Sequence, residues 1–297
     1  MKKIACLVLA LIMSLSLVGC GGSDNSQGAT DTTAATSTSS GILQTVLDRG
    51  YLIVGTGSSN TPWHFVDENG EYAGFDIEMA KILANALFGD PEAVEFVEQS
   101  SDSRIANVLT GKVDICIDFL TITPARAQQI AFSVPYYTEA MGLLLKKDGK
   151  FASYDELMAA VESGEEVTIA VMQNADAEAY VQAAVPGAKV DTYEEQALVY
   201  QAVASGQADG GVCDKSNISY IVGQNPELYF DSEIYFNQNN FAAGMNPNDQ
   251  VWINYVNTVF IDCMSGMTFE QYNEAYEKWF GIELGEPTVG KPAIFNQ

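Results

Sequence analysis

The segment DFLTITPARAQQIAFSVPYY, residues 118–137, holds one of only three arginines in the 297-residue chain. This arginine, Arg126, follows a Thr-Ile-Thr-Pro run that begins at Thr121. Arginine presents a planar fork of N–H donors that binds both oxygens of a carboxylate at once. The residue type therefore points to recognition of an anionic group. Two structural alternatives stay open, because Arg126 could instead cap local structure or pair with Asp118.

Short apolar runs that are typical of buried strands alternate with amphipathic helical patterns along the chain. The first part contains predicted strands at 51–56, 94–99 and 113–118 and predicted helices at 74–89 and 102–111. Asn69-Gly70 between apolar residues predicts a hairpin. Strand, helix and strand at these spacings imply parallel pairing with helical crossovers.

The same alternation restarts after Lys150, and this second part predicts a second sheet with its own helices. Its predicted strands lie at 167–173, 189–193 and 208–214. Two extended segments, at 136–147 and 239–247, separate the two parts, and helices are predicted within 249–281. We therefore predict an α/β fold in which two sheet-and-helix lobes are joined by two hinge strands, with a cleft between the lobes.

The predicted boundaries follow from this pattern. One lobe comprises residues 42–139 and 241–285, the other comprises 143–237, and 286–297 form a C-terminal tail. Open α/β sheets bind ligands at the carboxyl ends of their strands. We expect the segments that follow strands to line the cleft, namely 55–63, 99–104, 118–126, 173–176 and Asp214.

The N-terminal residues are predicted to direct export rather than to fold. Two lysines precede an apolar run, so residues 1–19 have the layout of a signal peptide. Leu17-Val18-Gly19-Cys20 resembles the lipobox of bacterial lipoproteins, in which the chain is cut before the cysteine and the new N-terminal Cys20 carries lipid. The alternative is an ordinary secretory signal with an incidental cysteine. Residues 20–41 contain no large apolar side chain and are predicted to form a flexible tether.

Composition excludes several classes of function. The formal net charge is −25, and cleavage after residue 19 makes it two units more negative because two lysines are lost. Such a field repels nucleic acid. The body holds one histidine, His64, which we expect to pack in the hairpin, and three widely spaced cysteines, Cys116, Cys213 and Cys263. We predict buried structural thiols, no zinc site and no other cofactor.

Three segments resemble the extracytoplasmic solute-binding proteins of ABC importers for polar amino acids. They are GFDIEMAKILA (74–84), GKVDICIDFLTITPARAQQIAFSVPYY (111–137) and ADGGVCDKS (208–216). The resemblance covers residues 42–281 and is greatest for the branch that binds aspartate and glutamate. It implies a periplasmic-binding-protein-like fold, a lipid-anchored monomer beside the membrane, and a permease of an ABC transporter as partner.

The resemblance also implies roles for six residues. Arg126 would take the ligand α-carboxylate, helped by Thr121 and the backbone beside Phe119, and Asp214 would take the α-ammonium from the other lobe. Arg104 would hold a side-chain carboxylate, although it could form only a surface ion pair. Trp63 and Phe119 are candidates for either a ligand platform or the core. A ligand that touches both lobes stabilises the closed state, because it meets both charged groups only there.

Two departures from the family pattern leave the ligand open. Asn174-Ala175-Asp176 stands where the family has a Gly-Thr-Thr-like turn, and it adds a negative charge near the expected carboxylate. Either Asp176 points away and caps the following helix, which we prefer, or the ligand is not a standard α-amino acid. Gly57 and Asn60 stand where many relatives carry a charged residue and an aromatic. Acidic or amide side chains are favoured, and other small polar amino acids stay open.

The sequence thus predicts a binding protein that captures a polar amino acid by hinge closure and delivers it to an importer. Two alternatives belong to other classes. A cyclohexadienyl-dehydratase-like enzyme on the same scaffold would need a general acid and base, and His64 is the single imidazole available. A sensory lipoprotein would keep the fold and signal through a partner.

Overall fold

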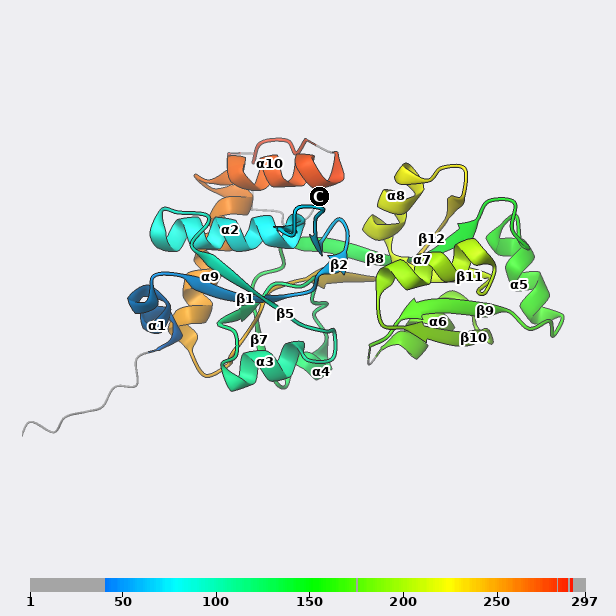
Figure 1. Ribbon diagram of the computed structural model, residues 1–297, viewed down its shortest axis with the longest axis horizontal. Coiled ribbons are helices and arrows are strands. Elements are labelled where there is room, and N and C mark those ends of the chain that lie inside the picture. Colours follow the sequence, from blue (N-terminus) through cyan, green and yellow to red (C-terminus); the bar gives the residue numbers. More distant parts are fainter. Residues whose placement is uncertain (1–40, 175, 282, 288, 291–297) are drawn as a thin grey trace, which may run out of the picture. The chain divides into compact units, whose positions relative to one another are not determined.

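The computed structural model describes residues 41–174, 176–281, 283–287 and 289–290 (Figure 1). The predicted signal peptide, Cys20 and all but the last residue of the predicted tether lie outside the described residues. Within the described part of the chain, no helix is both long enough and apolar enough to cross a bilayer.

The first sheet has the strand order β5-β1-β6-β13-β7. Its strands are β1 (Leu52–Thr56), β5 (Val94–Glu98), β6 (Ile115–Cys116), β7 (Ala131–Phe132) and β13 (Gly244–Met245). Strand β1 runs parallel to β5 and β6, whereas β13 runs antiparallel to β6 and β7. Val54 and Ile115 are fully buried, as expected for parallel strands that are covered on both faces.

Helices from both ends of the chain surround this sheet (Figure 1). They are α1 (Ile42–Arg49), α2 (Phe75–Phe88), α3 (Arg104–Thr110), α4 (Pro124–Ala127), α9 (Gln250–Ser265) and α10 (Phe269–Phe280). Helix α2 packs against α9 and α10, and its apolar face enters a core that contains Phe75, Trp252 and Phe260. The predicted hairpin is present as β3 (His64–Val66) and β4 (Tyr72–Ala73), with β2 (Ser59–Asn60) beside β3.

The second sheet has the order β10-β9-β11-β8-β12. Its strands are β8 (Tyr137–Lys146), β9 (Thr168–Met172), β10 (Lys189–Tyr193), β11 (Gly210–Asp214) and β12 (Tyr229–Phe241). Its helices are α5 (Tyr154–Glu162), α6 (Ala177–Ala184), α7 (Gln196–Ser205) and α8 (Lys215–Gln224). Separate apolar cores, one around Leu143 and Ile169 and one around Leu144 and Val199, stabilise this second lobe.

Strands β8 and β12 connect the two lobes. They pair antiparallel, with Tyr137 opposite Phe241 and Glu139 opposite Asn239. After β12 the chain returns to the first sheet as β13. The structure therefore confirms the predicted α/β fold with two lobes and two hinge strands.

Two strands differ from the expectation. The strand predicted at 113–118 is regular only at Ile115–Cys116, although the N–H groups of Asp114 and Ile117 also donate to the backbone of β1. The chain then turns at Phe119, whose φ is 33°. Strand β12 begins at Tyr229, ten residues before the extended segment that we predicted. Register shifts between Asp231 and Tyr235 and between Phe236 and Asn239 break the regular alternation of side chains. The start of this strand therefore lacks the alternating apolar and polar pattern from which a strand is predicted.

Candidate functional site

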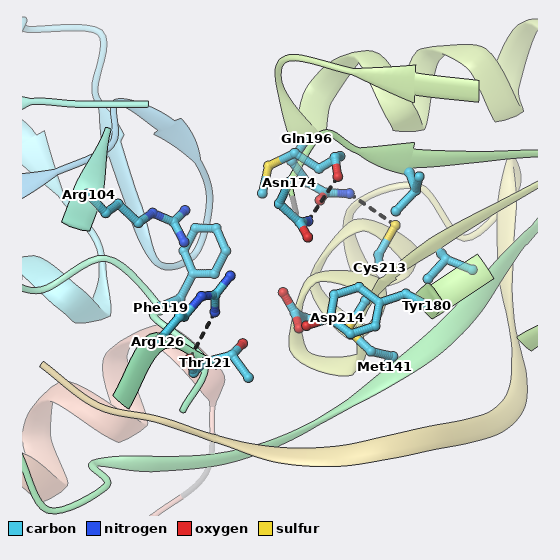
Figure 2. Close-up of a pocket in the computed structure, with 13 residues that line it drawn as sticks. Arg104, Phe119, Thr121, Arg126, Met141, Asn174, Tyr180, Gln196, Cys213 and Asp214 are labelled. Carbon is cyan, nitrogen blue, oxygen red and sulfur yellow. Dashed lines mark hydrogen bonds between the residues drawn. The ribbon is translucent and has the colours of Figure 1, made fainter. Parts of the chain in front are cut away.

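A cavity lies where both lobes contribute side chains (Figure 2). The first lobe supplies Arg104, Phe119, Thr121 and Arg126. The second supplies Met141, Val171, Met172, Asn174, Tyr180, Gln196, Val212, Cys213 and Asp214. Figure 2 shows the two arginines and Phe119 facing Asp214 and Tyr180 across this cavity. Five of the six residues predicted to bind ligand therefore meet at one place.

Local structure explains the position of Arg126. Thr123 caps the short helix α4 by accepting a hydrogen bond from the backbone N–H of Arg126 at 3.2 Å, and Pro124 begins the helix. The Arg126 Nη1 donates to the carbonyl oxygen of Thr121 at 2.8 Å. Burial, followed by the nearby charge of Arg104, lowers the pKa of Arg126. The guanidinium is held in place by one backbone contact and keeps further donors for a ligand.

Asp176 faces Arg126 from the second lobe. The Arg126 Nη2 lies 3.5 Å from the Asp176 Oδ2, and the Asp176 side chain is 39% exposed. We preferred the interpretation in which Asp176 points away and caps α6. Asp176 does occupy the N-cap position of α6, but the predicted direction of its side chain is wrong. Asp176 makes no side-chain cap bond, and its own N–H donates to the Asn174 Oδ1 at 2.8 Å. Attraction by the opposite charge of Arg126 accounts for this orientation.

Arg104 forms a buried ion pair within its own lobe rather than a surface pair. Its Nε lies 3.0 Å from the Asp118 Oδ2, and its Nη2 donates to the Ser101 Oγ at 2.9 Å. The guanidinium carbon also lies 4.6 Å from the centre of the Phe119 ring. This geometry combines a charge-assisted hydrogen bond with a cation–π contact. The charge of Arg104 is therefore compensated before any ligand arrives.

Asp214 ends β11, and α8 begins at the next residue. Its backbone occupies the N-cap position, and its side chain makes no cap bond. Burial, followed by the charge of Glu139, raises the pKa of Asp214 well above the usual range. Glu139, on hinge strand β8, accepts hydrogen bonds from the N–H groups of Ala140 and Ser216.

Burial raises the pKa of Glu139 as well. Among the described residues, neither Asp214 nor Glu139 takes part in an ion pair. The second lobe thus offers a buried carboxylate without a cation, which suits a ligand ammonium.

The remaining predicted residues have distinct positions. Thr121 lines the cavity and pairs with Phe241 in an isolated bridge. Trp63 is not among the residues that line this cavity. It is fully buried, with its ring against those of Phe75, Tyr137, Phe241 and Phe280. Its Nε1 donates to the Ser216 Oγ of the other lobe at 2.9 Å. The large apolar indole therefore belongs to the core of the first lobe, and its N–H group forms a hydrogen bond to the second lobe.

Sequence reasoning missed Tyr180 and Gln196. Tyr180 lies four residues after Asp176 in the turn-and-helix segment, so helical spacing carries a signal for it. Gln196 begins α7 shortly after β10, and the strand-end rule could have been extended to it. The Gln196 Nε2 donates to the Cys213 Sγ at 3.0 Å, and burial raises the pKa of Cys213. As predicted, Cys116, Cys213 and Cys263 are free and buried.

His64 is buried in β3, as expected, but it makes more contacts than hairpin packing. Its Nδ1 lies 2.8 Å from the Asp76 Oδ2, its Nε2 lies 3.2 Å from the Asp118 Oδ1, and its ring stacks on Phe119 at 4.7 Å. Asp76 in turn accepts bonds from the Phe119 N–H and the Tyr136 hydroxyl. This network holds Phe119 in its unusual backbone conformation. The described residues contain no cluster of three or more potential metal ligands.

Comparison with known proteins identifies the family of the chain. The chain matches the model of the family described as bacterial extracellular solute-binding proteins, family 3, over residues 52–282. The glutamine-binding protein of Geobacillus stearothermophilus is 29% identical over 222 residues, which cover 74% of this chain and 82% of that protein. The L-cystine-binding protein TcyJ of Escherichia coli strain K12 is 26% identical over 247 residues, covering 82% and 88% respectively.

A solved structure is similar over the same region. The ancestral amino acid-binding protein AncCDT-1, described as a precursor of cyclohexadienyl dehydratase, is 33% identical with a TM-score of 0.70. The similarity covers 80% of this chain and 99% of that one. With a family match over most of its length and the predicted two-lobed fold in place, the chain belongs to family 3 of the bacterial extracellular solute-binding proteins.

Proposed function

We propose that the protein captures a polar α-amino acid between its lobes and delivers it to the permease of an ABC importer. The observation that carries this proposal is the separation of charge across one cavity. Arg126 lies on the first lobe, and the carboxyl group of Asp214, which forms no ion pair with any described residue, lies on the second. A zwitterion matches both groups at once, and it stabilises the closed arrangement because only that arrangement brings both groups to it.

The roles follow from the chemistry of each group. Arg126 binds the α-carboxylate through two donors, and Thr121 and the backbone at Phe119 complete that side of the site. Asp214 accepts the α-ammonium. Phe119 supplies an apolar face, whereas we leave Trp63 out of the ligand shell because it packs in the core. Names of relatives support an amino acid, since they mention glutamine and L-cystine as the bound solutes.

The sequence favoured an acidic or an amide side chain, the acidic one through the resemblance to the branch that binds aspartate and glutamate and through Arg104. In the structure Arg104 is already paired with the buried Asp118. We therefore propose an amino acid other than aspartate or glutamate. The side-chain carboxylate of either would lie near Arg104, whose charge Asp118 already compensates.

Family membership assigns an extracytoplasmic location, and we propose lipid attachment at Cys20 after cleavage behind residue 19. Residues 20–41 then act as a tether, and a folded monomer of two lobes, 42–139 with 241–285 and 143–237, works beside the membrane. Replacing Cys20 with alanine should release the protein from the membrane fraction. Retention of the C20A variant in that fraction would contradict the lipid anchor.

We propose binding without catalysis. His64 is buried between the side chains of Asp76 and Asp118, and the three cysteines of the described body are buried thiols. Isothermal titration of the mature protein against the twenty common amino acids tests the main proposal. We expect micromolar or tighter binding of at least one of them. Binding of none, in a preparation that has been unfolded and refolded to remove bound solute, would overturn it.

A further inference from the structure

A second and larger cavity adjoins the proposed site. Its volume is about 400 Å³, compared with about 40 Å³ for the cavity between Arg126 and Asp214. The two cavities share Arg104, Phe119, Met172 and Gln196 in their walls. A solute anchored by its α-groups therefore has room for its side chain in the larger cavity.

The larger cavity carries an excess of negative charge. Glu98, Glu194 and Glu195 line it, and among the described residues none of the three forms an ion pair. Arg104 also lines it, but that guanidinium is already paired with Asp118. The cavity thus has an unfavourable potential for an anionic side chain and a favourable one for a cationic side chain.

The floor of the larger cavity contains a buried oxygen that lacks a donor. Asp118 is fully buried and lines this cavity. Its Oδ2 accepts hydrogen bonds from the Arg104 Nε and the Gln99 Nε2, each at 3.0 Å. Among the described residues, its Oδ1 accepts no hydrogen bond, although the His64 Nε2 lies 3.2 Å away. Buried carboxylate oxygens are normally satisfied, so this atom marks a position where a ligand donor would be stabilised.

Gly57 packs closely against the His64 ring beside that oxygen. A Cβ atom at this position would lie 2.7 Å from the His64 ring and 3.7 Å from the Asp118 Oδ1. Gly57 also lines the larger cavity. A larger side chain at this position would collide with the His64 ring, so glycine is required where this ring packs beside Asp118.

We infer that the solute is an α-amino acid with a long side chain that ends in a guanidinium or an ammonium group. The inference rests on the proposed function, because the α-groups stay between Arg126 and Asp214. The side chain runs through the larger cavity, its cationic end donates to the Asp118 Oδ1, and Glu98, Glu194 and Glu195 surround that end.

The test compares L-arginine with L-citrulline, which has nearly the same shape and a neutral end. Calorimetry of the refolded mature protein at low salt also includes L-lysine, L-ornithine and L-glutamine. We expect L-arginine, L-lysine or L-ornithine to bind at least tenfold more tightly than both L-citrulline and L-glutamine. Equal or tighter binding of L-citrulline or L-glutamine would overturn the inference and leave the proposed function standing, whereas binding of no amino acid would overturn both.

A pair of variants locates the effect without touching buried residues. The exposed pair E194Q/E195Q should weaken binding of the cationic amino acid severalfold. The control E270Q/E274Q changes the net charge equally at two exposed positions on α10, and it should leave that affinity unchanged. Equal losses in both double variants would show an effect of net charge alone and would overturn the assignment of the cationic end to this cavity.

Discussion

The two arginines of the site have the same chemistry and different surroundings. Arg104 pairs with a carboxylate of its own lobe, and the side chains of Arg104 and Asp118 are 6% and 1% exposed. Arg126 pairs at 3.5 Å with Asp176 of the other lobe, which is 39% exposed. A buried pair is costly to separate, whereas an exposed and longer pair contributes little. The difference teaches that Arg104 is a fixed part of the first lobe and that Arg126 can exchange its partner for a ligand.

The largest expected effect separates the two arginines by their roles in binding. Arg126→Ala removes two charge-assisted hydrogen bonds to the ligand carboxylate, each worth about 1.5–3 kcal/mol. Affinity should therefore fall roughly 100- to 10,000-fold, with little change in the free energy of unfolding of the empty protein. Calorimetry and thermal unfolding measure the two quantities. The control Arg126→Lys keeps the positive charge and should lose only the part of the affinity that comes from the second hydrogen bond to the carboxylate. Unchanged affinity in R126A would contradict the assignment of Arg126 to the ligand carboxylate.

Arg104→Ala should act on stability instead. It leaves the Asp118 carboxylate buried without its cation, which costs about 3–5 kcal/mol in the free energy of unfolding. Urea denaturation measures this loss. The double variant R104M/D118N should recover part of it, because no uncompensated charge then remains. An R104A protein as stable as the original would break the distinction between the two arginines.

Asp214→Asn should weaken binding roughly 10- to 100-fold, since one charge-assisted hydrogen bond to the ammonium is worth about 1.5–3 kcal/mol. The pH dependence has a definite sign. The pKa of Asp214 is raised in the empty protein, so its carboxyl keeps a proton above the usual range. A bound ammonium lowers that pKa, and binding therefore releases a proton and weakens as the pH falls through the raised pKa.

Calorimetry in two buffers with different ionisation enthalpies detects this proton. The observed enthalpy should depend on the buffer for the original protein and much less for D214N. The empty protein should also lose stability as the pH rises above the pKa of an unfolded aspartate, because the folded state holds the proton more tightly. The range to be measured is about pH 5 to 8, in which groups with a pKa near neutrality titrate. A binding enthalpy that does not depend on the buffer anywhere in this range would contradict proton release.

Trp63→Phe should have a smaller effect. It removes the hydrogen bond from the indole to the Ser216 Oγ, which joins the lobes at 2.9 Å, and it keeps most of the aromatic packing. A typical hydrogen bond contributes about 1 kcal/mol, so affinity should fall about fivefold if the bond forms only in the closed arrangement. A double-mutant cycle with Ser216→Ala isolates the pair. Additive effects in that cycle would show that this contact is not coupled to closure.

The smallest effect should have the opposite sign. Asp176→Asn removes the carboxylate that competes with the ligand for Arg126, and an exposed pair is worth about 0–1 kcal/mol. Affinity should rise by up to about fivefold, more at low salt than at high salt. Weaker binding in D176N would mean that Asp176 contacts the ligand itself, and it would reverse our account of the exchangeable pair.

Local patterns in the sequence carried much of this description. Short-range rules predict strand β1 and helix α2, including the left-handed Gly89 that ends α2. They also predict that Arg126 and Asp214 come after strands. The start of strand β12 at Tyr229 did not follow, because its bulges interrupt the alternation. The orientation of Asp176 was missed because its partner, Arg126, lies on the other lobe.

The sequence by itself determined the two α/β halves, the crossing strands, and one cation and one carboxylate at strand ends, because these depend on residue type and periodicity over a few turns. Only the tertiary structure decided that Asp118 compensates Arg104, that Asp176 reaches Arg126, and that Trp63 belongs to the core. Charges far apart along the chain compensate one another according to distance and burial in space, and neither quantity is written in local sequence.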